Sequence, residues 1–306
     1  MNKKAFIYII TAGVLWGTSG IFVKFLEPHG YTSLQLTALR GVISFIFFLI
    51  YAAIRDRKAF KITPKQLLYF AGIGASLFGT AGFYFMSLSA TSISTAVVLM
   101  YSAPIYVTVF SALFLGEKFN KIKITALVMM IVGCALVSGI VGGLKFDALG
   151  IIFGIISGVS FASYNILTKI CMQRSYSPIS TNLYGSAFMS LIALIFARPA
   201  EIILHTTKAP LLLVPSILAL GIITFVLPYL LYSLGMKYLP AGTVASLGTV
   251  EPLSACIFGI IMFDEKPSAF SLIGMILILL AVTFFGIAEA PLKKKNKTPK
   301  EKICTE

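Results

Sequence analysis

The stretch PIYVTVFSALFLGEK, residues 104–118, decides the fold because a similar stretch, PLSACIFGIIMFDEK, occurs at residues 252–266. In each copy a proline within an apolar run is followed thirteen residues later by a Glu-Lys pair. Pro104 and Pro252 are 148 positions apart in a chain of 306 residues. This spacing indicates a duplicated half, so we expect one repeat over residues 1–146, a second over 147–290, and a basic tail at 291–306.

The composition indicates where these repeats lie. Hydrophobic residues make up 58% of the chain, charged residues only 12%, and the mean hydropathy is +0.94. Soluble domains carry about 25% charged residues. Several charge-free runs are close to the ~20 residues that a helix needs to cross a bilayer. The sequence therefore predicts an all-α polytopic membrane protein.

Ten transmembrane helices are predicted, five in each repeat. The polar segment SLSATSIS at 87–94 divides the long apolar block 66–116 into two spans. The N-terminal apolar run lacks a small-residue cleavage site, so we expect it to be a retained helix rather than a signal peptide. The predicted spans are 5–26, 34–54, 67–89, 93–115, 122–141, 148–169, 179–197, 211–234, 241–262 and 269–288.

The distribution of basic residues predicts the orientation. With the N-terminus inside, most of the 25 lysines and arginines fall in inner segments, as the positive-inside rule requires. We therefore expect a multi-pass protein of the cell membrane with cytoplasmic N- and C-termini. The net charge of +14 indicates anionic lipids at the cytoplasmic face as partners, and no nucleic acid. The sequence leaves the oligomeric state open.

Metal, cofactor and nucleotide sites are not expected. The four cysteines are scattered, His29 and His205 fall in predicted outer loops, and no HExxH motif occurs. There is no GxxxxGK[ST] motif either. An intramembrane enzyme would need a nucleophile–base pair, paired aspartates or a metal site. Because Glu251 is the one carboxylate in the middle of a predicted span, no catalytic residues are assigned.

The two halves are expected to have opposite orientations in the membrane, because each contains an odd number of spans. The first and sixth spans also align, with Trp16 opposite Phe161 and Lys24 opposite Lys169. Inverted repeats of this kind are typical of secondary transporters, whose halves move about a site near the bilayer midplane.

These motifs together resemble the drug/metabolite transporter superfamily, and more closely its EamA branch. The residues that carry the resemblance are Trp16-Gly17, Pro104 with the closing GEK at 116–118, and Glu251-Pro252 with the closing DEK at 264–266. A glycine in place of Asp264 is commoner in the family, and we expect no functional loss from this difference. The resemblance implies a transporter of small metabolites, often an exporter of amino acids or related compounds.

Glu251 is the main candidate for coupling and for substrate binding. A charged side chain at mid-bilayer costs about 2.5–3.5 kcal/mol on insertion scales, so it faces protein or water. One interpretation is a carboxylate that exchanges protons or binds a substrate amine. The other is a structural glutamate that supports the break at Pro252.

Three prolines are candidates for helix breaks and gates. Pro104, Pro252 and Pro228 each remove a backbone donor within a predicted span. Irregular backbone at membrane depth is tolerated where it faces protein or a wet cavity. Matching breaks in the two halves would suit gates, and a static kink that improves packing is the alternative.

Aromatic and amide side chains are candidates for lining the cavity. Trp16 is the only tryptophan and falls within a span. It lines a cavity or packs as a filler against Gly13, Gly17 and Gly20, which recur at helical spacing and are predicted to permit close contact with another helix. Each of the others serves a substrate site or an interhelical hydrogen bond. They are Tyr84, Tyr101, Tyr164, Asn165, Tyr229 and Tyr232.

The remaining charged residues of the spans are assigned structural roles. Arg40 lies inside the second span, and we expect its long side chain to extend toward the outer headgroups, with pairing to a carboxylate of the protein or to a carboxyl group of the substrate as the alternative. Lys24 and Lys169 are expected to be membrane anchors. The pairs Glu117-Lys118 and Glu265-Lys266 are expected to end helices and to form latch contacts.

The predicted function is secondary active export of small metabolites, such as amino acids or related compounds, by alternating access. Its specific form is proton-coupled export, with Glu251 as the coupling residue. Uniport and exchange remain open. A flippase for lipid-linked sugars, or a receptor-like scaffold on the same fold, is the alternative, because fold does not fix function. A lateral groove open to lipid would favour the flippase, and a closed aqueous vestibule would favour a soluble metabolite.

Overall fold

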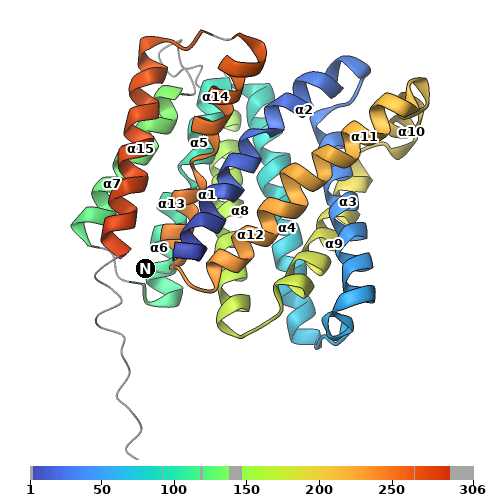
Figure 1. Ribbon diagram of the computed structural model, residues 1–306, viewed down its shortest axis with the longest axis horizontal. Coiled ribbons are helices and arrows are strands. Elements are labelled where there is room, and N and C mark those ends of the chain that lie inside the picture. Colours follow the sequence, from blue (N-terminus) through green and yellow to red (C-terminus); the bar gives the residue numbers. More distant parts are fainter. Residues whose placement is uncertain (1–2, 92, 118–119, 138–146, 265, 290–306) are drawn as a thin grey trace, which may run out of the picture.

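A computed structural model describes residues 3–91, 93–117, 120–137, 147–264 and 266–289 (Figure 1). Throughout these residues the regular structure is helical, without strands. Lys118, Glu265, Cys304 and the basic tail at 291–306 lie outside the described residues. The elements of the first half are α1 (Lys3–Gly17), α2 (Ser19–Leu26), η1 (Glu27–His29), α3 (Ser33–Arg55), η2 (Arg57–Phe60), α4 (Pro64–Ala90), α5 (Ile93–Tyr101), α6 (Ala103–Leu115) and α7 (Lys121–Val137).

The second half begins at an N-cap, where the Asp147 side chain accepts a hydrogen bond from the Gly150 backbone N–H at 3.0 Å. Its elements are α8 (Ala148–Gln173), α9 (Pro178–Phe196), α10 (Pro199–Lys208), α11 (Pro210–Gly221), the π-helical turn η4 (Ile222–Val226), α12 (Leu227–Met236), α13 (Ala241–Gly248), α14 (Glu251–Phe263) and α15 (Ala269–Glu289).

Eight helical stretches of the described chain are long and apolar enough to cross a membrane. They match the predicted spans one to four and six to nine. The predicted fifth span overlaps α7, which has 17 residues. The predicted tenth span overlaps α15, in which Ala269–Phe285 is a shorter apolar helix over the described residues. The stretches are Lys3–His29, Ser33–Arg55, Pro64–Ala90, Thr95–Leu115, Ala148–Gln173, Pro178–Phe196, Pro210–Met236 and Ala241–Phe263.

Four of these stretches are interrupted, and the interruptions have local causes. α5 gives way to α6 at Ser102, and α13 gives way to α14 at Thr249 and Val250. Pro104 and Pro252 each occupy the first turn of the helix that follows, where the missing N–H and fixed φ of proline are favourable. Pro228 follows η4 in the same way.

The first stretch is interrupted without a proline. α1 ends at Gly17 and α2 begins at Ser19. The Thr18 hydroxyl donates to the Leu15 carbonyl at 2.7 Å, so a side chain replaces part of the helical hydrogen bonding there. This interruption was not predicted from the sequence.

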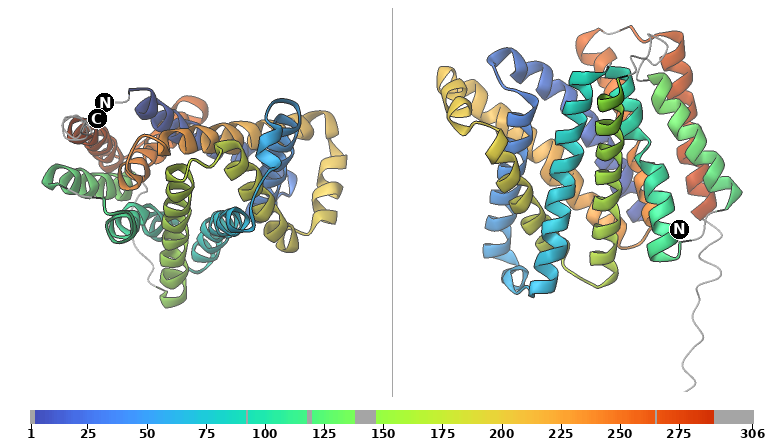
Figure 2. Two further views of the ribbon diagram at one scale, coloured as in Figure 1. Left: turned by 90° about the horizontal axis from the view of Figure 1, so that it is seen from below. Right: turned by 180° about the vertical axis from the view of Figure 1, so that it is seen from behind.

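The packing relates the two halves to each other. α4 packs along α8, and α12 packs along α1 in the same way, while α3 packs on α9 and α7 on α15. Figure 2 shows α7 and α15 side by side at one end of the molecule and α10 at the other. Each contact pairs an element of one half with an element of the other, so the core lies between the halves.

The ends of α6 and α14 are built alike. Gly116 (φ +64°) and Asp264 (φ +51°) both adopt the left-handed conformation. Their backbone N–H groups donate to the carbonyls of Ser111 and Gly259, five residues earlier in each case. A left-handed residue is the usual end of a helix and favours glycine. Asp264 therefore occupies a position at which the backbone prefers the residue of the first half.

We expect Asp264→Gly to raise the free energy of unfolding by about 0.5–1 kcal/mol. Removing Cβ relieves the left-handed strain, while the added flexibility of the unfolded chain offsets part of the gain. The melting temperature of the purified protein checks this. Asp56→Gly is the control, because Asp56 has a φ of −143° and gains nothing from glycine. Equal effects of the two substitutions would contradict the explanation.

Candidate substrate-binding cavity

A cavity of about 810 Å³ lies between the two halves of the molecule. It is lined by the interrupted regions, where α2, α6, α13 and α14 begin or end, together with faces of α3, α4 and α12. The cavity extends from Trp16 and Glu251 to a mouth formed by Glu27, Ser33 and Lys266. Glu27 follows α2 and Lys266 follows α14, and both helices begin beside the deep part of the cavity. Among the described residues, the lining thus runs from this deep part to one end of the molecule.

Glu251 is the centre of a polar cluster on the cavity wall. It is the first residue of α14, so it lies at the positively polarised end of that helix. Its carboxyl group faces the Tyr101 hydroxyl closely enough for a hydrogen bond and interacts electrostatically with Arg40. Tyr84 and Tyr229 also lie within electrostatic range of Glu251. Three helices of the first half (α3, α4 and α5) and one of the second (α12) thus place polar side chains around one carboxylate.

The structure divides the predicted site residues into two groups. The first group lines the cavity: Trp16, Tyr84, Tyr101, Pro104, Tyr229, Glu251 and Pro252. Tyr164, Asn165, Pro228 and Tyr232 are buried and are not part of the cavity lining. Whether any of them contacts a substrate stays a prediction.

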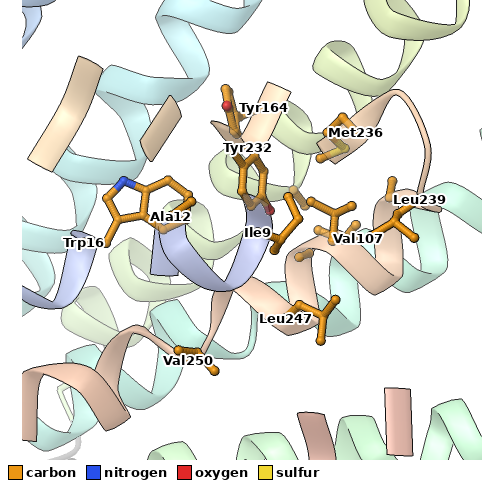
Figure 3. Close-up of a cluster of buried hydrophobic side chains, with 14 of the residues drawn as sticks. Ile9, Ala12, Trp16, Val107, Tyr164, Tyr232, Met236, Leu239, Leu247 and Val250 are labelled. Carbon is orange, nitrogen blue, oxygen red and sulfur yellow. The ribbon is translucent and has the colours of Figure 1, made fainter. Parts of the chain in front are cut away.

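Tyr232 of the second group packs beside Trp16 (Figure 3). Trp16 contacts Tyr229 and Tyr232, with ring centroids 5.1 Å apart in both cases. The Tyr232 hydroxyl donates to Asn165 Oδ1 at 2.6 Å, and Asn165 Nδ2 donates to the Phe161 carbonyl at 2.8 Å. This buried layer fixes the orientation of the indole at the cavity wall.

Arg40 does not extend toward the headgroups, and that prediction is wrong. Its side chain lines the cavity, with Nη2 donating to Thr37 Oγ1 at 3.2 Å. A polar stripe along α3 could have indicated this, since Ser33, Thr37, Arg40 and Ser44 recur at helical spacing. Of α3, Ser33, Leu36 and Arg40 line the cavity, whereas Thr37 and Ser44 are buried outside it.

The glycines of the first helix have different roles. A Cβ on Gly13 would lie 3.0 Å from the Gly248 carbonyl oxygen, and one on Gly17 would lie 2.6 Å from Ser254 Cβ. These two permit the close approach that the sequence predicted. A Cβ on Gly20 would meet nothing within 4 Å, because Gly20 lines the cavity. For Gly20, the prediction of a helix contact is wrong.

The end of the molecule opposite the mouth is held by two charged side chains, which we term the α12–α13 latch. Glu117 accepts hydrogen bonds from the backbone N–H groups of Ala241, at 2.7 Å, and Gly242, at 3.3 Å. Lys169 Nζ donates to the carbonyls of Met236, at 2.8 Å, and Leu239. A carboxylate at the start of α13 and an ammonium at the end of α12 match the helix dipoles.

The latch changes the interpretation of two predicted residues. Lys169 is 8% exposed, so it joins α8 to α12 and is not a membrane anchor. Glu117 does follow the end of α6, and its contacts are with backbone groups of the second half. Lys24 is exposed, with Nζ 4.1 Å from the centroid of the Phe263 ring.

Comparison with known proteins identifies the family. The model of the EamA-like transporter family matches residues 3–139 and again residues 148–287. The chain belongs to the EamA-like transporter family. The two matches fall on the two halves whose elements pack against each other.

Relatives of this EamA-like chain are named as transporters. An uncharacterized transporter of Archaeoglobus fulgidus is 30% identical over 90% of this chain and 93% of its own length. The uncharacterized transporter YwfM of Bacillus subtilis is 26% identical over 95% of each chain. A solved crystal structure shares the fold, with a TM-score of 0.76, 20% identity and coverage of 96% of this chain and 100% of its own. The protein is a multi-pass membrane transporter.

Proposed function

We propose that this EamA-like protein is a secondary active transporter that exports a small metabolite across the cell membrane by alternating access. The observation that carries the proposal is the cavity between the halves, open at one end and closed by the α12–α13 latch at the other. In alternating access the same site is reached first from one side and then from the other. A cavity with one open end is one of the two states that this mechanism requires.

The orientation follows from the positive-inside rule. The connections at the latch end carry Arg55, Lys58, Arg174 and Lys237, and the mouth end carries fewer basic residues. The latch end is therefore cytoplasmic and the cavity faces outward. With α7 and α15 as further crossings, ten spans form two inverted repeats of five. The matched packing of α4 on α8 and α12 on α1 supports this arrangement.

Glu251 is proposed to couple transport to protons. It is the only carboxylate that lines the deep part of the cavity in the described chain, and Glu27 lies at the mouth. A buried carboxylate that also meets the substrate can exchange a proton for the substrate in each cycle. The sequence lacks a nucleotide-binding motif, so an ion or substrate gradient is the proposed source of energy.

A flippase is the second candidate, and one observation favours it. A small groove of about 330 Å³, lined by Thr32, Ser33, Leu34, Phe85, Leu88 and Ser89, lies between the start of α3 and the end of α4. Ser33, Phe85 and Leu88 also line the large cavity, so the two are contiguous. A headgroup in the cavity with an acyl chain in this groove is the arrangement that a flippase needs.

Flux measurements in liposomes test the proposal. The purified protein is reconstituted into vesicles with an acidic interior, and the uptake of labelled amino acids, nucleosides and sugars is measured with and without a protonophore. We expect at least one solute to accumulate and the protonophore to abolish its accumulation. Translocation of fluorescent lipid analogues without flux of any soluble compound would overturn the proposal in favour of the flippase.

A further inference from the structure

We infer that Arg40 and the indole N–H of Trp16 form a binding site for the carboxylate group of a partly apolar solute. This inference rests on the proposed transport function and adds the chemical class of the substrate. It is carried by two buried donors without a protein partner, which belong to residues that line one cavity, and by the charges of the residues around them.

Arg40 supplies the positive charge of the site. Its Nε is buried and has no hydrogen-bond partner in the protein, although Nη2 is bonded to Thr37. Arg40 lies in the electrostatic range of Tyr229 and Glu251, yet it forms no direct ion pair with any residue that the structure describes. A buried cation that is only partly compensated favours an anion beside it.

Trp16 supplies a second donor. The residue is 7% exposed, and its Nε1 is likewise buried and without a protein partner. Figure 3 shows this nitrogen on the side of the ring away from Tyr232. Tyr229 connects the two donors, because its ring contacts Trp16 and its hydroxyl interacts electrostatically with Arg40. Indole N–H is a donor only, so this wall of the cavity requires an acceptor.

The remaining lining defines the rest of the solute. The deep cavity contains one cation, Arg40, and one carboxylate, Glu251, so a single negative charge on the solute is matched and a polyphosphate is not. Leu77, Met100, Phe161 and Phe225 provide apolar surface. A solute with a carboxylate and an apolar body would contact the cation Arg40 and these apolar side chains. In a zwitterion, an ammonium group would also contact the anionic part of the lining, Glu251.

The fluorescence of Trp16 reports binding directly, because the chain has one tryptophan and it lines the cavity. The purified full chain in detergent is titrated with three non-fluorescent solutes of one skeleton: leucine, 4-methylpentanoate and 3-methylbutylamine. Each is measured on the native protein, Arg40→Gln and Arg40→Lys. Arg55→Gln is the matched control, because Arg55 is exposed at the end of the same helix.

We expect leucine and 4-methylpentanoate to bind about tenfold or more tightly than the amine, and Arg40→Gln to remove that preference. Arg55→Gln should retain it, and Arg40→Lys should give an intermediate preference because it keeps the charge without the fixed N–H geometry. If Arg40→Gln does not fold, the preference for carboxylates over the amine is compared between the native protein and Arg40→Lys, and this comparison tests the inference.

Three results would overturn the inference: no response to either carboxylate, an amine that binds as tightly as the acid, or an unchanged preference in a folded Arg40→Gln protein. The transport function is judged separately by liposome flux. Flux of amines or neutral solutes, without flux of carboxylates, would support the transport function and would contradict the carboxylate site.

Discussion

Glu251→Gln should abolish substrate accumulation driven by a pH gradient while binding and exchange of substrate persist. The amide has nearly the shape of the acid and keeps an acceptor toward Tyr101, but it cannot exchange a proton. One coupled proton moving through a gradient of one pH unit supplies about 1.4 kcal/mol, enough for a tenfold accumulation. We therefore expect the inside-to-outside ratio in liposomes to fall to about one, the value at equilibrium without coupling.

Two controls separate coupling from folding. Asp56→Asn makes the same acid-to-amide change in the connection after α3, outside the cavity lining, and should accumulate substrate like the native protein. Counterflow, in which labelled solute exchanges with unlabelled solute at equal pH, should persist in Glu251→Gln. If accumulation survives in Glu251→Gln, the coupling role is wrong. If folding, counterflow and accumulation fail together, the structural interpretation of Glu251 is correct.

Gly17→Val should be strongly destabilising, whereas Gly20→Val, three residues away, should leave folding intact. A Cβ on Gly17 would lie 2.9 Å from the backbone nitrogen of Ala255 and 3.0 Å from the backbone oxygen of Glu251. Backbone atoms cannot move aside as a flexible side chain can, so α1 and α14 must separate. Overpacking of this kind costs about 1–3 kcal/mol and occasionally more.

Gly20→Val provides the matched comparison, because the added side chain enters the cavity. Its melting temperature should stay close to that of the native protein, while transport falls because the volume beside Trp16 shrinks. Thermal unfolding in detergent and liposome flux measure the two effects. Equal destabilisation by both substitutions would show that Gly20 is packed like Gly17, and that the cavity does not extend to α2.

A feature of this fold could be predicted from the sequence where it depends on residues that are neighbours in the chain. It could not be predicted where it depends on packing between distant segments. Proline in an apolar run acts on its own backbone, so interruptions near Pro104 and Pro252 were predictable. The helix is interrupted at Thr18, whose hydroxyl donates to a carbonyl of the preceding turn. Thr37 makes the same kind of hydrogen bond within α3, which continues without a break. Sequence alone could not distinguish it from Thr11 or Thr37.

The same distinction applies to the candidate site. Glu251 and Trp16 were predictable as cavity residues because a carboxylate and a lone indole within a span are expensive or unusual in lipid. Arg40 and Lys169 have long side chains that can reach either lipid headgroups or protein. Their direction depends on which helix packs beside them, a tertiary contact absent from the local sequence. Gly20 was misassigned for the same reason, since helical spacing predicts a face but not what lies opposite it.

The α12–α13 latch has one further consequence, for mutational tolerance. Glu117 and Lys169 form hydrogen bonds with main-chain carbonyls and amides of Met236, Leu239, Ala241 and Gly242. Every amino acid presents the same carbonyl, and all but proline the same amide. The hydrogen bonds of the latch therefore depend on the two charged residues and on the course of the backbone. The side chains of the connection are limited by packing instead, because Met236, Leu239 and Ala241 are buried in the core.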